Sequence, residues 1–242
     1  MLISTLVKCV NCGGQGEILV SGKILCSRCS RQEIFHRVRR NLSRSGVNLK
    51  ESKSLLIYPS FYREIAELLN VLLAKTCVNC NLTIRYLETD SKSSINLTLR
   101  ELLLQANKEP EKIVFLPFTA DFFSSYLVYS STSIVGSYLS LYGLTFNISE
   151  KTFISPLYDT PLSEMKGFSE LTGELKTSDE MFNTILNWFR SNFSDNEVFH
   201  TFPPSVQVII NKFNKCRRCG ALIETNEYCK ACSTELSLET KE

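Results

Sequence analysis

The sequence predicts an α/β protein whose parallel sheet is flanked by a zinc-binding module near each end of the chain. Two observations support this fold class. In the middle of the chain, apolar segments of strand length alternate with segments of helical periodicity, which is typical of a parallel sheet covered by helices on both faces. In addition, all ten cysteines fall into C-x-x-C pairs. Without the features of a secretion signal, such pairs indicate metal ligands rather than a framework of disulfides.

The composition sets the limits of the prediction. With 242 residues, 43% of them hydrophobic, the chain can bury one sizeable core and small satellites. The net charge is only +2, so any attraction to nucleic acid must come from a local surface. The start, MLISTLVKC, lacks a cationic region and a long apolar region, and no apolar run reaches the length of a membrane span. We therefore expect a cytoplasmic protein with no membrane segment.

The first module, residues 1–30, has the pattern of a zinc ribbon, CVNCGGQGEILVSGKILCSRC. Between its cysteine pairs, the segments EILV and KIL flank Ser21 and Gly22, which indicates a β-hairpin. Structural zinc takes four ligands in a tetrahedron, and two C-x-x-C pairs supply them. The predicted zinc ligands are Cys9, Cys12, Cys26 and Cys29.

The second module, residues 214–242, contains CRRCGALIETNEYCKAC followed by a polar tail. Its predicted zinc ligands are Cys216, Cys219, Cys229 and Cys232. Four thiolates leave no open position for water, so both predicted sites are structural rather than catalytic. Paired disulfides or free thiols are the alternative for both modules.

The fifth pair, Cys77 and Cys80, has no partner pair. It follows a predicted helix, where the helix dipole disfavours a thiolate, so redox or cluster chemistry is not favoured here. A local disulfide or two inert thiols fits this position better.

Residues 31–52 are predicted to form a basic helix and a linker. From Lys23 to Lys53 the chain has nine basic residues against two acids, and this local excess favours a surface that binds RNA phosphates. A second basic cluster, without acids in the sequence around it, lies at the start of the last module. The predicted RNA-binding residues are Arg37, Arg39, Arg40, Arg44, Lys212, Lys215, Arg217 and Arg218. The alternative is solvated charge on an amphipathic helix.

Residues 53–213 are predicted to form the α/β domain. Strands are expected at SLLIY, LTIRYLE and KIVFLPF, each followed by a helix, the last of which is the long segment DFFSSYLVYSSTSIVGSYLSL. Residues 144–175 are less regular and contain LTFNI and KTFIS. Further helices are expected at SDEMFNTILNWFRSNF, capped by Asp179 or Ser178, and at PPSVQVIINKF, opened by its prolines.

The turn after the first predicted strand, YPSFYRE, has the position of a phosphate-binding turn. Such a turn brings bare backbone N–H groups to the ligand and usually requires glycine. This turn has no glycine; it contains Tyr58, Pro59, Phe61 and Tyr62. Proline lacks an N–H, and the aromatic rings would fill the space that a phosphate needs. Either the turn has lost its ligand, or it belongs to an ordinary doubly wound sheet that never bound one.

The order of these features resembles the cytosolic tRNA 2-thiolation proteins. These are relatives of the PP-loop ATP pyrophosphatases, with an adenine nucleotide alpha hydrolase-like fold flanked by two zinc modules. The resemblance covers nearly the whole chain, from ILCSRCSRQEIFHRVRRNL through KIVFLPFTAD and FISPLYDTPLSEM to NKCRRCGALIETNEYCKAC. Catalytic members carry an SGGxDS loop where this chain has YPSFYRE. Of their acidic segment after the third strand only Asp121 matches, and no cysteine lies between Asn81 and Lys215 to hold sulfur or a cluster.

These departures resemble the non-catalytic second subunit of the cytosolic thiouridylase complex, in a degenerate PP-loop form. The resemblance implies that the chain binds tRNA and a catalytic PP-loop subunit, in a complex that converts wobble uridine to 2-thiouridine with sulfur from a ubiquitin-like carrier. We accordingly expect no catalytic residue, no ATP and no iron–sulfur cluster. The alternatives are a zinc-ribbon RNA-binding protein outside thiolation and an active ATP-dependent tRNA sulfurtransferase with an atypical nucleotide loop.

Overall fold

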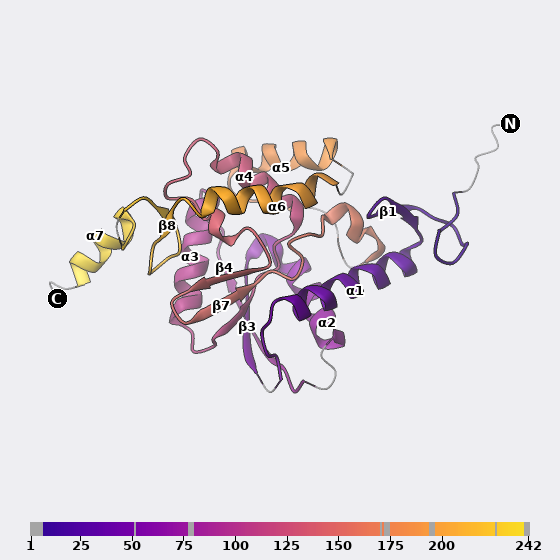
Figure 1. Ribbon diagram of the computed structural model, residues 1–242, viewed down its shortest axis with the longest axis horizontal. Helices are drawn as coiled ribbons and strands as arrows, with labels where there is room; N and C mark the ends of the chain where they lie inside the picture. Colours follow the sequence, from indigo (N-terminus) through magenta and orange to yellow (C-terminus); the bar gives the residue numbers. More distant parts are fainter. Residues whose placement is uncertain are drawn as a thin grey trace.

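The computed structural model describes residues 7–50, 52–76, 80–169, 171, 175–193, 197–225 and 227–239. The molecule is elongated, with an α/β body in the middle and the two cysteine modules at opposite ends (Figure 1). Among the described residues, no helix has the length and apolar character needed to cross a membrane.

The central sheet has five strands in the order β4-β3-β5-β7-β6. Four of them run parallel: β3 (Lys53–Pro59), β4 (Thr83–Thr89), β5 (Ile113–Phe115) and β7 (Lys151–Ile154). The edge strand β6 (Thr145–Ile148) pairs antiparallel with β7. The predicted parallel α/β fold is thus confirmed, and the segments LTFNI and KTFIS extend its sheet.

Three helices make the crossovers between the parallel strands. They are α2 (Arg63–Thr76), α3 (Ile95–Lys108) and α4 (Ala120–Ser130). The chain moves from β3 to β4 on one side and then back across β3 to β5. Because such crossovers are right-handed, α2 covers one face of the sheet, while α3 and α4 cover the other.

The remaining long helices form outer layers. On one side, α1 (Ser27–Arg44) packs on α2; on the other, α5 (Glu180–Asn192) and α6 (Glu197–Ile210) pack on α4 (Figure 1). The helix α5 begins at the predicted cap, since the Asp179 carboxylate accepts a hydrogen bond from the Phe182 N–H at 3.1 Å. Both faces of the sheet are therefore covered, and six of the seven residues of β3 are buried, as expected of a central parallel strand.

The terminal modules contain short hairpins. In the first, β1 (Ile18–Val20) and β2 (Lys23–Leu25) are joined by Ser21 and Gly22, whose positive φ angles of 48° and 73° form the predicted tight turn. In the second, β8 (Asn214–Lys215) pairs with β9 (Leu222–Ile223). The helix α7 (Lys230–Glu239) then ends the described chain.

The structure corrects the predicted long helix after β5. The helix α4 ends at Ser130, and only a short 3₁₀ turn, Leu139–Leu141, follows where helix was expected. The hydroxyls of Ser130 and Ser131 donate to the carbonyls of Tyr126 and Val128 at 2.5 and 2.7 Å. Such bonds compete with the helical backbone pattern, and Gly136 then takes φ +86°, which is incompatible with a continuous helix.

Two other helices begin earlier than predicted. The helix α1 begins at Ser27 and includes Cys29, so the predicted domain boundary at residue 30 falls within a helix. The helix α6 begins at Glu197 and contains Pro203 and Pro204 inside it, so the prolines do not open it.

Candidate functional site

The turn after β3 is filled by aromatic side chains. It forms a short 3₁₀ helix, Ser60–Tyr62, that leads directly into α2. Tyr62 is 0% exposed, and its hydroxyl lies 2.9 Å from Oγ1 of Thr119, in the turn after β5. Its ring packs edge-on against Phe118 and Phe122, with centroids 5.3 and 5.5 Å away. Burial holds the pKa of Tyr62 far above its usual range, so its hydroxyl stays protonated.

This cluster lies where a ligand would bind in such a fold. From β3 the chain turns to one side of the sheet and from β5 to the other, so the two strands form the topological switch point. In open α/β sheets, ligands bind at the carboxyl ends of the strands at that point. Here Tyr62, Phe118 and Phe122, all fully buried, take this position.

Asp121, the one residue that matches the acidic segment of the catalytic family members, forms hydrogen bonds within this chain. Asp121 is 2% exposed. One carboxylate oxygen accepts the N–H of Leu162 at 3.1 Å, and the other accepts Nε of Arg190 at 3.2 Å. Asp121 therefore joins α4 to α5 and to the 3₁₀ helix Leu162–Gly167, here called η3.

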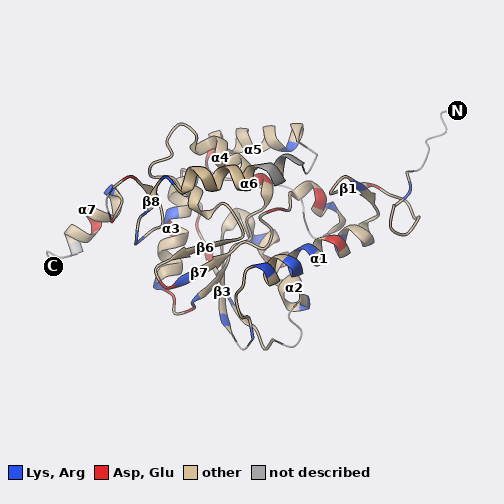
Figure 2. Cartoon of the chain, viewed as in Figure 1, with Lys and Arg blue, Asp and Glu red and all other residues tan. Residues whose placement is uncertain are grey.

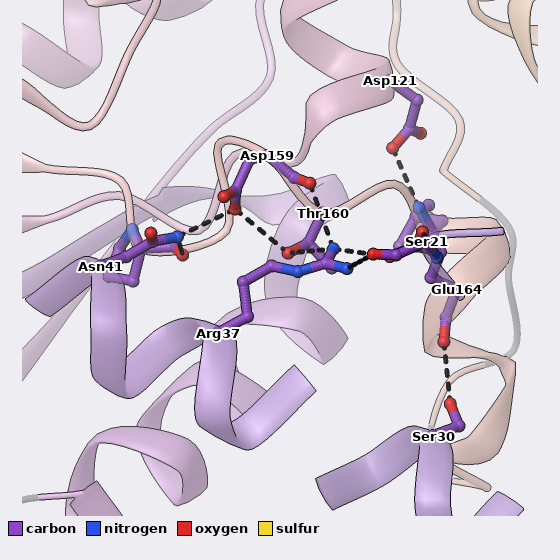
Figure 3. Close-up of polar contacts among 10 residues, drawn as sticks. Ser21, Ser30, Arg37, Asn41, Asp121, Asp159, Thr160 and Glu164 are labelled. Carbon is purple, nitrogen blue, oxygen red and sulfur yellow. Dashed lines mark hydrogen bonds and ion pairs between the residues drawn. The ribbon is translucent and has the colours of Figure 1, made fainter. Parts of the chain in front are cut away.

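Arg37 does not lie on the predicted RNA-binding surface. It is 2% exposed and donates to Oε2 of Glu164 at 2.5 Å, to Oγ1 of Thr160 at 3.2 Å and to Oγ of Ser21 at 2.7 Å (Figure 3). Beside it, Nδ2 of Asn41 donates to Asp159 at 2.8 Å. The prediction is corrected for this residue because Arg37 fixes the N-terminal hairpin and α1 to the segment after β7.

The other arginines of α1 are exposed. Arg39, Arg40 and Arg44 lie on the surface of the helix, where basic residues are concentrated (Figure 2). None of the three forms an ion pair with another described residue. For these residues, RNA binding stays a prediction.

The second basic cluster has acidic neighbours in space. Arg217 pairs with Glu227 at 3.0 Å, and Arg218 lies 3.8 Å from Glu235. The expectation of a cluster without acids is therefore wrong, because the fold brings in residues from later in the module. Lys212 and Lys215 are exposed, and the Lys215 ammonium also lies 4.9 Å above the ring centre of Phe146.

The four cysteines of the first module come together. Their sulfur atoms all lie within 4.8 Å of one another, and all four thiols are free. The separation of 3.7 Å between Cys12 and Cys26 is close to the edge of about 3.8 Å expected for a tetrahedron with metal–sulfur bonds of about 2.3 Å. Burial raises the pKa of Cys9, but hydrogen bonds from backbone amides outweigh it and lower that pKa to about 6.

The four cysteines of the second module form a similar group that is more deeply buried. Cys216, Cys219 and Cys232 are buried, whereas in the first group Cys12 is exposed. A hydrogen bond from Cys219 is the largest of the effects that lower the pKa of Cys216 to about 4. Gly220 takes φ +75°, and a Cβ there would come within 2.6 Å of Ile148, so this knuckle lies tightly against β6.

Two side chains from the α/β domain reach the sulfurs of the second group. Nη2 of Arg100, on α3, lies 3.7 Å from the sulfur of Cys232 and also donates to Glu235 at 2.7 Å. The buried hydroxyl of Tyr138 lies 3.7 Å from the sulfur of Cys219. Sequence analysis identified neither residue, because each is far from its cysteine in the chain, by 132 and 81 positions.

The fifth cysteine pair lies partly outside the described residues. Cys77 is among the residues that are not described. Cys80 is disulfide-bonded, whereas the cysteines of the two modules are free.

Comparison with known proteins identifies the fold. No protein-family model matches the sequence, and no curated protein matches it either. Among solved structures, the chain is similar to the U34-tRNA thiolase NcsA from Methanococcus maripaludis with its 4Fe-4S cluster. The similarity covers 98% of this chain and 97% of that chain, with a TM-score of 0.58 and 16% sequence identity. The predicted PP-loop-like fold, with cysteine groups at both ends, is thus confirmed.

The cofactor prediction needs a correction. The exclusion of an iron–sulfur cluster does not hold, since the similar structure contains a 4Fe-4S cluster. Four thiolates are also a donor set that zinc and iron–sulfur clusters share. By donor chemistry, each of the two cysteine groups could bind either a zinc ion or an iron–sulfur cluster.

Proposed function

We propose that this chain is a non-catalytic subunit in the 2-thiolation of tRNA at the wobble uridine, where it binds tRNA and a catalytic PP-loop thiouridylase. The chain shares its fold, over 98% of its length, with a structure described as a U34-tRNA thiolase. The arrangement of two cysteine groups around a PP-loop-like sheet supports the same process.

Aromatic side chains fill the turn after β3, and this observation supports a non-catalytic role for the chain. A phosphate is held by backbone N–H groups that the chain leaves uncovered. In this chain the Tyr62 ring lies in that region and is hydrogen-bonded to Thr119, with Phe118 packed against it. The scaffold keeps its strand–turn–helix geometry, while its own aromatic side chains take the place of the ligand. The chemistry would then belong to a partner.

The exposed arginines of α1 are the proposed contact with tRNA. Arg39, Arg40 and Arg44 have no acidic partner among the described residues, so their charges are available to phosphates. The complex would act in the cytoplasm, and a ubiquitin-like sulfur carrier would reach it through the catalytic partner.

The two cysteine groups would stabilise the folds of the two terminal modules. Cys9, Cys12, Cys26 and Cys29 would hold one metal centre, and Cys216, Cys219, Cys229 and Cys232 the other. A bound zinc ion or cluster supplies a covalent cross-link between short segments that bury too little apolar surface to fold alone.

Purification of the tagged chain from its own cells tests this proposal. We expect it to recover tRNA together with a second PP-loop protein that carries an intact glycine-containing phosphate loop. Recovery of RNA without such a protein would favour an RNA-binding function outside thiolation. A version with Arg39, Arg40 and Arg44 changed to glutamine should still recover the protein partner but lose most of the tRNA.

A further inference from the structure

A cavity lies beside the exposed arginines, next to the carboxyl edge of the sheet. It has a volume of about 520 Å³, which is within the size range of small-ligand sites. Its lining comes from four parts of the chain: Arg40 and Arg44 on α1, Gly143 before β6, Tyr158 after β7, and Pro203 and Gln207 on α6.

The charges in this cavity suit an anion. Arg40 and Arg44 are one helical turn apart and therefore lie on the same face of α1. The one acid in the wall, Asp159, already accepts a hydrogen bond from Asn41 at 2.8 Å. With two arginines and one carboxylate, the wall carries a net positive charge that could hold one phosphate.

Two ring side chains also line the cavity. Tyr158 is partly buried, and Pro203 lies in the same cavity. Tyr158 lines the same cavity as Arg40 and Arg44. Burial is the main reason why the pKa of Tyr158 is raised, so its hydroxyl stays protonated. Gly143 also lines the cavity, and its φ of +137° disfavours a side chain at this position.

The side-chain amide of Gln207 also lines the cavity. The side-chain amide of Gln207 donates to the carbonyl of Tyr142 at 3.1 Å. This bond fixes the orientation of the amide and leaves its oxygen as an acceptor for a base edge.

We propose that this cavity binds one unstacked nucleotide of a single-stranded RNA segment, with its phosphate on Arg40 and Arg44 and its base on Tyr158. Proteins that recognise single-stranded RNA place splayed bases on aromatic rings and phosphates on arginines. A duplex would not fit, because its bases are stacked and its surface cannot enter a concave site. The inference rests on the proposed function and gives it a specific RNA-binding site.

Binding of short RNAs to the full chain tests this site. The probe is a fluorescent eight-nucleotide oligouridylate, measured by anisotropy, with an RNA duplex of the same length for comparison. Tyr158→Leu and the double variant Arg40→Gln/Arg44→Gln should each weaken binding of the single strand about tenfold, as expected for one stacked base or one phosphate contact. Tyr158→Phe keeps the ring, and Lys92→Gln changes an exposed basic residue outside the cavity, so both should stay within about twofold of the unaltered chain.

Three results would overturn the inference. One is equal loss of binding in Lys92→Gln and in the cavity double variant, which would indicate a diffuse basic surface. Another is unchanged binding in Tyr158→Leu. The third is competition by uridine monophosphate at the same concentration as the oligonucleotide, which would assign the cavity to a free nucleotide.

A second measurement does not depend on how the variants fold. Oligouridylate carrying 5-iodouridine should form a photochemical cross-link to Tyr158 in the unaltered chain, located by peptide mass spectrometry. Cross-links that map only to other residues would contradict the assignment. Failure of these tests leaves the proposed function intact as long as the tagged chain recovers tRNA and a PP-loop partner; absence of both would remove the proposed function itself.

Discussion

The hydroxyl of Tyr62 lies 2.9 Å from Oγ1 of Thr119, and this contact joins the turn after β3 to the turn after β5. The two turns form the switch point of the sheet, which in this architecture is the position of a ligand. In this protein Tyr62, Phe118 and Phe122 fill the position and form part of the core.

Truncation of Tyr62 should therefore destabilise the whole domain. We expect Tyr62→Ala to lower the free energy of unfolding by about 3–5 kcal/mol, as for other buried aromatic residues, because it leaves a cavity among Phe118 and Phe122. Tyr62→Phe loses only the hydrogen bond to Thr119 and should cost about 1 kcal/mol. Chemical denaturation measures both, and equal effects of the two variants would show that the ring packing contributes little.

The buried pair of Arg37 and Glu164 makes a second prediction. Arg37→Met leaves the Glu164 carboxylate buried without its counter-charge, so we expect a loss of about 3–5 kcal/mol in stability. The double variant Arg37→Met/Glu164→Met should recover much of that loss, because no unpaired charge remains. Arg39→Met is the matched control on the exposed face of the same helix and should change stability by no more than about 0.5 kcal/mol. A similar loss in both single variants would mean that burial of Arg37 is not the cause.

The contact of Arg100 with the second cysteine group predicts an effect on metal retention. A charged donor near a thiolate offsets the negative charge of a four-cysteine site, and loss of such an outer contact typically weakens metal binding about 10–100-fold. Arg100→Gln should therefore release the metal of the C-terminal group to a chelator earlier, while the N-terminal group in the same molecule keeps its metal. Zinc, iron and sulfide are measured together. Arg63→Gln serves as the control because Arg63 forms a comparable ion pair, with Glu88, and donates to neither of the two described cysteine groups.

Sequence patterns predicted the parts of the fold that depend on local chemistry. Alternating apolar segments predicted the sheet, and Ser21 and Gly22 predicted the hairpin turn. Of the two expected caps of α5, Ser178 and Asp179, the structure uses Asp179. The eight cysteines were assigned correctly to two groups, since C-x-x-C spacing holds sulfurs together without reference to the rest of the chain.

Features that depend on distant contacts were not predicted. Arg37 looks like its neighbours in a basic helix, and its burial depends on Glu164, 127 residues later. Glu227 and Glu235 balance part of the C-terminal basic cluster, although they are not adjacent to it in sequence. The end of α4 depends on Ser130, Ser131 and Gly136. The side-chain hydrogen bonds of the two serines and the backbone angle of the glycine override the helical pattern of apolar residues.

The content of 2-thiouridine in bulk tRNA, measured by nucleoside mass spectrometry with and without this gene, is the sharpest test of a role in thiolation. We predict that deletion removes the modification and that the unaltered gene restores it, because the proposed function makes this chain a required subunit. Unchanged 2-thiouridine in the deletion would contradict the account and would show that a thiolase-like scaffold serves another purpose.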